Sequence, residues 1–182
     1  MENVHLAALR AYYGRLDGRT AGFRSAGLCC ARGCGLCCET GDPEITAFEA
    51  LPLAMHILSD SGLLARYEAY RRSGAAKPCF FYDAAADYGC TVYAIRPMIC
   101  RMFGYAGGRD KHGRPRFVPC ARMENANRTY RPDDAPVFQD LHYELLSFAP
   151  PELARVQAFA DALAEAVDRE GMRRELRDPK QG

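Results

Sequence analysis

The sequence predicts an α+β protein that is mostly α-helical, with a small irregular cysteine-rich core and a short β-hairpin flanked by N- and C-terminal helices. Three observations support this prediction. Apolar residues recur at helical spacing towards both ends of the chain, short aromatic and β-branched runs lie in the middle, and nine cysteines crowd the region before residue 121. With 182 residues, 48% of them hydrophobic and 26% charged, the chain can bury one substantial core.

The chain divides into three predicted segments. Residues 1–27 form an N-terminal helix that packs on the core, residues 28–125 a cysteine-cluster domain, and residues 126–182 a C-terminal helical extension. The first helix is predicted from helical spacing and is expected to end near Gly18, its apolar positions being Leu6, Leu9, Tyr13 and Leu16.

Two helices and a hairpin are expected next. Thr46 and Glu49 resemble a capping box that opens an apolar helix, although Pro52 is expected to kink this helix or delay its start. A second helix is expected to close at Gly74, with apolar positions Leu63, Leu64, Tyr67 and Tyr70. The runs "CFFY" and "CTVY", separated by "DAAADYG", then predict a small β-hairpin.

The second half of the chain is predicted to be helical again. Pro97 suits the first turn of a helix that contains Cys100. A further helical segment, with Val137, Leu141 and Leu145 as apolar positions, precedes the break at Pro150 and Pro151. One long apolar stripe follows, made of Leu153, Val156, Phe159, Ala160, Leu163 and Val167. Such a stripe is typical of a core or a subunit contact, so an oligomer through the C-terminal helices is one expectation.

Charge and hydropathy exclude several classes of protein. The formal net charge is +1, which argues against a general attraction to nucleic acid or acidic membranes. The start of the chain shows no cationic leader before an apolar stretch, and no later segment has the length of a membrane span, so we expect a cytoplasmic protein without a membrane partner. Residues 109–131 are basic and residues 132–170 acidic, which favours docking of one on the other over an external acidic or phosphate-bearing partner.

The cysteines indicate metal ligation. Nine is an odd number, and without a secretory signal a disulfide framework is the poorer explanation. Thiolates are soft ligands that suit zinc or iron–sulfur centres, and eight of them suffice for two tetrahedral sites. Adjacent side chains diverge in an extended segment, so Cys37 and Cys38 would serve two centres, or one centre and the core, unless a tight loop converges both. The candidate ligands are Cys30, Cys34, Cys37, Cys38, Cys79, Cys90, Cys100 and Cys120.

The stretches "CGLCC" (34–38), "CTVYAIRPMICRMFG" (90–104) and "PCARM" around Cys120 resemble the YkgJ-type cysteine-cluster proteins, also described as the CxxCxxCC zinc- or iron-chelating family. The flagellin lysine methylases are similar in this segment. The resemblance implies metal-ligand roles for Cys34, Cys37, Cys38, Cys79, Cys90, Cys100 and Cys120. The first cysteine of the family pattern would fall at Ala31, so Cys29 and Cys30 compete for the eighth role.

Two classes of function follow from these residues. The first is a metal-centre protein that holds an iron–sulfur cluster or zinc for electron transfer, modification chemistry or metal handling, together with an unidentified protein partner or substrate. The alternative is a thiol–disulfide oxidoreductase with Cys34 and Cys37 as its attacking and resolving pair. The metal interpretation leads because a dithiol enzyme leaves the other cysteines unexplained. Arg96 and Arg101 would offset the charge of such a centre, or else Arg96 simply precedes Pro97 on a solvated turn and pairs with a carboxylate.

We predict that Cys30, rather than Cys29, is the eighth ligand. Cys30 can turn back across Gly33 towards Cys34, whereas Cys29 points the other way in an extended segment and suits the core. Cys29→Ser should therefore keep close to full metal content, while Cys30→Ser and Cys37→Ser each lose at least one centre. Metal per chain in the three variants is the measurement, and loss in Cys29→Ser with retention in Cys30→Ser would reverse the assignment.

Overall fold

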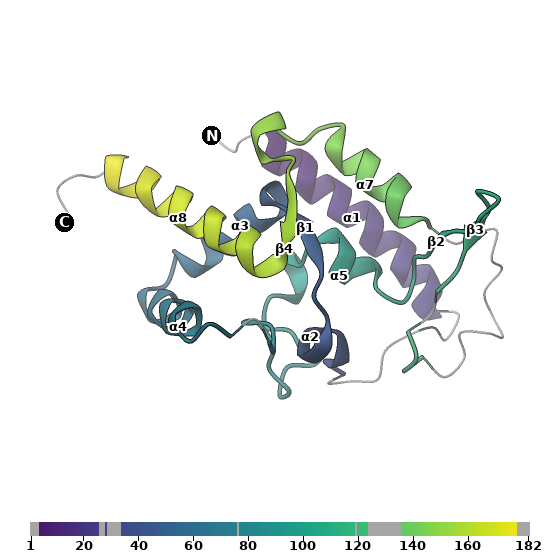
Figure 1. Ribbon diagram of the computed structural model, residues 1–182, viewed down its shortest axis with the longest axis horizontal. Helices are drawn as coiled ribbons and strands as arrows, with labels where there is room; N and C mark the ends of the chain where they lie inside the picture. Colours follow the sequence, from purple (N-terminus) through teal and green to yellow (C-terminus); the bar gives the residue numbers. More distant parts are fainter. Residues whose placement is uncertain are drawn as a thin grey trace. The chain divides into compact units, whose positions relative to one another are not determined.

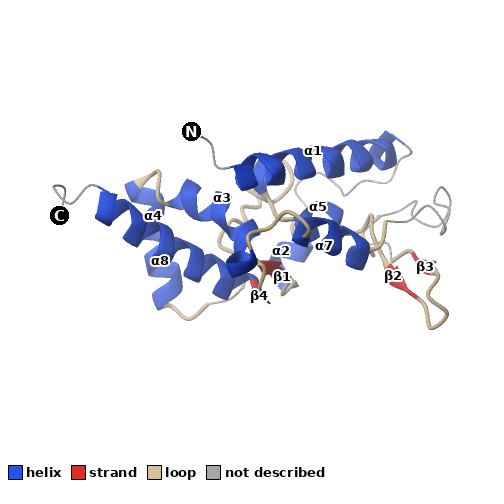
Figure 2. Cartoon of the chain, turned by 90° about the horizontal axis from the view of Figure 1, so that it is seen from above, coloured by secondary structure: helices blue, strands red, loops and turns tan. Residues whose placement is uncertain are grey.

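A computed structural model describes residues 4–25, 28, 34–75, 77–118, 120–123 and 136–177. The chain forms two compact units, each made of two separate segments. Unit 1 comprises Met1–Arg32 and Pro97–Pro151, and unit 2 comprises Gly33–Arg96 and Glu152–Gly182. Helices dominate and the described strands are short, as Figure 2 shows, so the predicted mostly helical α+β class is confirmed. None of the described helices combines the length and hydrophobicity needed to span a bilayer.

Unit 1 is built around one long helix. Its described elements are α1 (Val4–Ser25), α5 (Met98–Met102), α7 (Phe138–Leu146) and the antiparallel strands β2 (Gly108–Arg109) and β3 (Pro115–Arg116). In Figure 1, α1 runs beside α7, and the Tyr12 hydroxyl of α1 donates to the Leu141 carbonyl of α7 at 2.8 Å. The helix α5 also packs against both α1 and α7.

The expected end of the first helix near Gly18 was wrong, because α1 continues to Ser25. A glycine inside a helix costs only about 1 kcal/mol relative to alanine, which later contacts can offset. Thr20 is fully buried, and the Phe23 ring stacks on Tyr105 with centroids 5.7 Å apart. These contacts beyond Gly18 hold the last turns in place.

Arg101 belongs to the core of unit 1. Its side chain is 1% exposed, one of its guanidinium nitrogens lies 2.5 Å from the Asp17 carboxylate, and its guanidinium carbon lies 4.2 Å from the centre of the Tyr13 ring. A buried cation needs such compensation, because desolvation is otherwise costly. The role of Arg101 that the structure shows is therefore an ion pair in the core of unit 1.

Unit 2 combines four helices with one small sheet. Its described elements are α2 (Leu36–Thr40), β1 (Glu44–Thr46), α3 (Ala47–Ile57), α4 (Ser61–Arg72), the 3-10 helix η1 (Tyr93–Ile95), β4 (Val156–Ala158) and α8 (Phe159–Arg177). Strand β1 pairs antiparallel with β4, and α3 packs along α8 (Figure 1). The apolar seam between the two helices includes Leu53, Ala54, Ile57, Leu163, Ala166 and Val167, all nearly inaccessible to solvent.

The predicted C-terminal helical stripe begins too early in the sequence. The 3-10 helix η3 (Pro151–Leu153) and strand β4 precede α8, so Leu153 and Val156 lie outside the helix. Val156 pairs with Thr46 across the small sheet, a tertiary contact that a periodicity argument does not contain. The stripe from Phe159 onward is helical as expected.

Helix α3 begins where its capping box predicts. The Thr46 hydroxyl accepts a hydrogen bond from the Glu49 amide at 3.2 Å, and the Glu49 carboxylate accepts one from the Thr46 amide at 3.2 Å. Pro52 neither delays the start nor ends the helix. A proline inside a helix costs about 3 kcal/mol, because it removes one backbone hydrogen bond and its ring crowds the preceding turn. Each fully buried side chain of α3, such as Phe48 or Leu53, contributes about 1.5–3 kcal/mol in the other direction.

The predicted hairpin is smaller than its two aromatic runs suggest. A single antiparallel bridge joins Tyr82 to Cys90, and the Thr91 amide donates to the Phe81 carbonyl at 3.0 Å. The second run leaves the hairpin at once and enters η1. A tight turn with one bridge therefore replaces two regular strands.

Because the Thr46 cap is fully buried, we expect Thr46→Ala to lower the free energy of unfolding by about 1–2 kcal/mol. The measurement is urea unfolding followed by circular dichroism. The matched control is Ser59→Ala, which removes an exposed hydroxyl at the other end of the same helix and should change stability by less than about 0.5 kcal/mol. Equal effects of the two substitutions would contradict the role of the cap.

Candidate metal centre

Unit 2 brings five of the predicted ligands onto neighbouring backbone segments. Cys34 precedes α2, and Cys37 and Cys38 lie within it. The amide of Cys79 donates to the carbonyl of Cys38 at 2.8 Å, which joins the segment after α4 to α2. Cys90 lies at the closing bridge of the hairpin. All five are free thiols, half-buried except for the exposed Cys37.

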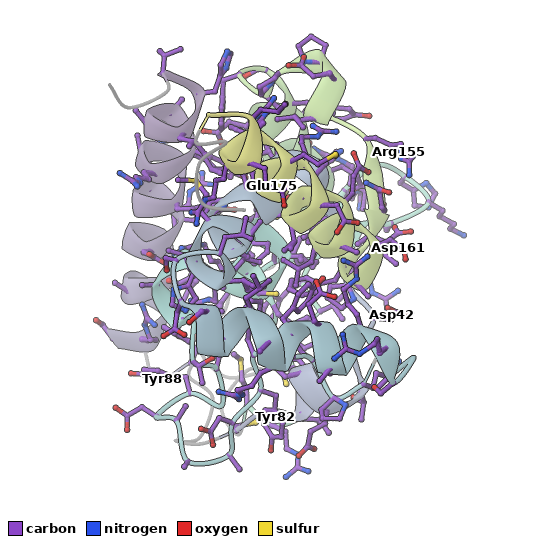
Figure 3. All side chains as sticks on the ribbon, turned by 90° about the vertical axis from the view of Figure 1, so that its left-hand side faces the viewer. Asp42, Tyr82, Tyr88, Arg155, Asp161 and Glu175 are labelled. Carbon is purple, nitrogen blue, oxygen red and sulfur yellow. The ribbon has the colours of Figure 1, made fainter. Side chains whose placement is uncertain are left out.

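Two glycines make this close approach possible. A Cβ at Gly35 would lie 1.9 Å from the Tyr82 ring, so only glycine lets that ring cover the start of α2. Gly89 has a φ of +64°, and a Cβ there would lie 2.9 Å from the Gly35 Cα. The Tyr82 hydroxyl donates to the Glu39 carboxylate at 2.6 Å, which fixes the ring over α2. Figure 3 labels Tyr82 and Tyr88, which lie on the loops that follow α4.

The adjacent cysteines converge rather than diverge. The predicted divergence assumed an extended segment, but Cys37 and Cys38 lie in the helical turn α2, and their sulfur atoms are 4.0 Å apart. A tetrahedral zinc ion with Zn–S bonds of about 2.3 Å holds its sulfur ligands about 3.8 Å apart. The separation of this pair therefore suits two ligands of one ion.

The thiols interact through their charges. The hydrogen bond with Cys38 lowers the pKa of Cys37 to about 6, and the same bond raises the pKa of Cys38. Burial raises the pKa of Cys79 to about 11 and also raises that of Cys90. After the hydrogen bond and burial, the charges of Cys37, Cys79 and Cys90 raise the pKa of Cys38 further. Negative charge on any of these thiols thus disfavours the thiolate form of Cys38, and a nearby cation would have the opposite effect.

Arg96 is a buried cation whose charge affects the pKa values of two of these thiols. It is 5% exposed, its guanidinium lies 3.4 Å from the centre of the Tyr93 ring, and its Nη1 donates to the Tyr93 carbonyl at 2.9 Å. After the hydrogen bond with Cys38, its charge is a further cause that lowers the pKa of Cys37. At Cys90, where burial raises the pKa, the charge of Arg96 opposes that rise.

The remaining predicted ligands belong to unit 1 or fall on residues that are not described. Cys100, on α5, and Cys120 belong to unit 1, where a Cβ at Gly104 would lie 3.0 Å from the Cys120 Cβ. Cys30, and its competitor Cys29, lie outside the described residues. The ligand roles of all eight cysteines stay a prediction.

The donor atoms of the described residues suit a thiolate metal centre, but their positions do not form a complete ligand set. Soft sulfur donors suit zinc or iron, and the Cys37–Cys38 pair has the separation that one ion needs. No group of three or more His, Cys, Asp or Glu side chains able to hold a metal ion occurs within the part of the chain that the structure describes.

A mostly helical fold that carries free thiols on the short helix α2 and on the loops beside it is typical of a cysteine-cluster protein. Residues 28–129, more than half of the chain, match the CxxCxxCC family, which is described as a "Putative zinc- or iron-chelating domain". The chain belongs to this family, and the resemblance to the CxxCxxCC family stated from the sequence is confirmed. Neither a curated protein nor a solved structure gives a significant match.

Sequence reasoning missed the residues that support the cluster. Tyr82 and Glu39 hold the start of α2, yet an aromatic in "CFFY" indicates only a strand, and a single glutamate after two cysteines has no distinctive pattern. Gly89 was read only as part of a loop. Its close approach to the Cys34–Gly35 backbone is a tertiary contact, which the loop sequence alone does not indicate.

We expect Gly35→Ala to displace the Tyr82 ring and to lower both stability, by about 1–3 kcal/mol, and metal content. Adding Tyr82→Ala to that variant should restore part of the metal content, because it removes the clash. Urea unfolding and metal per chain are the two measurements. Gly171→Ala, in α8 with open space around it, is the control and should be neutral or slightly stabilising. A Gly35→Ala protein with unchanged stability and metal content would show that the close approach is unimportant.

Proposed function

We propose that this protein is a cytoplasmic metal-binding protein in which cysteine thiolates hold zinc or iron, with iron either alone or in an iron–sulfur centre. Cys34, Cys37, Cys38, Cys79 and Cys90 supply the ligands from unit 2. Cys100 and Cys120 are the two further positions that the family resemblance implies, and Cys30 is the predicted eighth ligand. Membership of a zinc- or iron-chelating family supports metal binding. A reducing compartment suits the proposal, because it keeps so many thiols available.

The observation that carries the proposal is the 4.0 Å separation of the Cys37 and Cys38 sulfurs. Two neighbouring thiols at this distance can share one proton in a hydrogen bond. A divalent soft cation can bind both sulfurs and replace the protons that burial alone would leave on them. We therefore propose that both belong to the same ion. This corresponds to the alternative in which a tight turn converges both sulfurs, and not to two centres or to one centre and the core.

Such a centre would supply Lewis acidity if it holds zinc, or electron transfer if it holds iron and sulfide. The chain's own residues do the rest. The Tyr82–Glu39 hydrogen bond positions α2, and Arg96 places one positive charge where thiolates concentrate negative charge. Arginine stays charged at all working pH values, so this compensation is permanent.

Purification without oxygen, followed by metal, sulfide and visible-absorption analysis, tests the proposal. We expect about one to two centres per chain, the range that four thiolates per tetrahedral site allows. Removing the metal with a chelator should lower the melting temperature and reduce the circular dichroism signal, because structural metals contribute folding energy. Metal-free protein that is well folded and rich in titratable disulfides would contradict the proposal.

The same measurements separate the alternative function. A thiol–disulfide oxidoreductase that uses Cys34 and Cys37 keeps its fold without metal and exchanges with a small disulfide substrate. The lowered pKa of Cys37, caused by its hydrogen bond with Cys38, would favour attack by that sulfur. The thiol of Cys37 is hydrogen-bonded to that of its neighbour Cys38, a close pair that the proposed Cys34–Cys37 dithiol does not require, and this favours the metal proposal.

A further inference from the structure

Unit 1 carries an excess of positive charge. Among its described residues, Lys and Arg outnumber Asp and Glu by ten to four. The described part of unit 2 has the opposite balance, with ten Lys and Arg against fourteen Asp and Glu. The near-neutral chain is therefore made of one basic and one acidic unit.

Every described carboxylate of unit 1 is already engaged. Asp17 pairs with Arg101 at 2.5 Å, Asp140 with Arg109 at 2.6 Å, and Glu144 with Arg15 at 2.6 Å. The fourth, Asp110, accepts hydrogen bonds from two backbone amides of its own turn, at 2.8 and 2.9 Å. The expected docking of the basic segment on the acidic segment thus holds for Arg109 and Asp140. The other ion-paired carboxylates of unit 1, Asp17 and Glu144, bind Arg101 and Arg15.

The cations left over concentrate on the β2–β3 hairpin. Lys111, Arg114 and Arg116 are exposed, and Asp17, Asp140 and Glu144 form their ion pairs with other arginines. In Figure 1 the hairpin extends beyond the end of α7. Arg116 lies in β3, and Arg114 immediately precedes that strand, where its carbonyl accepts from the Asp110 amide across the hairpin. Side chains two residues apart in an extended segment lie on the same face, about 6.5–7 Å apart. Gly108, the cross-strand partner of Arg116, has open space around it and does not cover that face.

The turn that carries these cations is held rigidly. The Asp110 amide donates to the Arg114 carbonyl at 2.9 Å, and the Gly113 amide donates to the Asp110 carbonyl at 3.0 Å. Arg109 ties the hairpin to α7 through Asp140 and also donates to the Gly113 carbonyl at 2.9 Å. A preorganised turn loses little conformational entropy on binding, so its charges are available for a partner.

We propose that Lys111, Arg114 and Arg116 on this hairpin dock an extended acidic segment of a partner protein. Acidic side chains two residues apart in an extended chain have the same spacing as Arg114 and Arg116. Pro115 lacks an amide hydrogen and discourages strand addition at β3, so side-chain charge rather than main-chain pairing selects the partner. A nucleic acid fits less well, because such binding typically neutralises about 6–10 phosphates and this face offers three cations.

The probe is a fluorescent peptide of alternating glutamate and serine, with a lysine–serine peptide as its opposite-charge control. We expect the glutamate peptide alone to bind, with an affinity that falls as salt rises. Arg114→Glu/Arg116→Glu should weaken binding by about tenfold or more. The control Arg19→Glu/Arg66→Glu makes the same change in net charge at two exposed helical arginines and should weaken it by less than about twofold.

All variants must keep the circular dichroism spectrum and metal content of the parent protein. If Arg114→Glu/Arg116→Glu misfolds, Arg114→Gln/Arg116→Gln is measured in its place. Equal weakening by both pairs of substitutions would overturn the proposal in favour of general charge attraction. Tighter binding of a single-stranded oligonucleotide than of the peptide would overturn the class of partner. Self-association that the hairpin substitutions abolish would replace the partner with a second copy of the chain. Absence of peptide binding at low salt would overturn the proposal outright.

Discussion

The hydrogen bond from the Cys79 amide to the Cys38 carbonyl is the contact on which the thiol cluster depends. It joins two segments separated by α3 and α4, at a place where neither segment has a regular partner strand. The Tyr82 ring over Gly35 and the Gly89 turn against Cys34 extend the same contact on either side. Without these three approaches, the cysteines would belong to independent loops, and no ion could recruit them without ordering the loops first.

The sequence motif "YAIRPMICR" serves two parts of the molecule. Its first half ends unit 2, where Tyr93 and Arg96 stack and bring a buried positive charge to the thiols. Its second half begins unit 1, where Arg101 pairs with Asp17 inside the core. Two arginines that look equivalent in the sequence therefore do different work, one acting on the thiols and one on packing. Their common need is compensation for burial, met by an aromatic ring in both cases and by a carboxylate as well for Arg101.

Local signals predicted much of the fold. The capping box at Thr46 and Glu49 fixed the start of α3, and the left-handed Gly74 followed α4 as expected, because both depend on residues close together in the chain. The extension of α1 beyond Gly18, the acceptance of Pro52 inside α3 and the pairing of Val156 with Thr46 depend on tertiary burial. The cysteine set was visible from composition and spacing. The convergence of Cys37 and Cys38 was not, because it follows from the helical turn that Gly35 opens.

The location of the thiols also limits how far a bound ion can act on the fold. The α3–α8 seam buries large apolar side chains with no contribution from cysteine, so apolar burial stabilises this part of unit 2. The loops around α2 and the hairpin contain one bridge, few buried apolar groups and several half-buried thiols whose pKa values are raised by burial. The local stability of such a region depends on the hydrogen bonds or metal ions that the sulfur atoms bind. An ion at Cys37 and Cys38 would therefore order the loop end of unit 2, while the helical seam stays folded through its own packing.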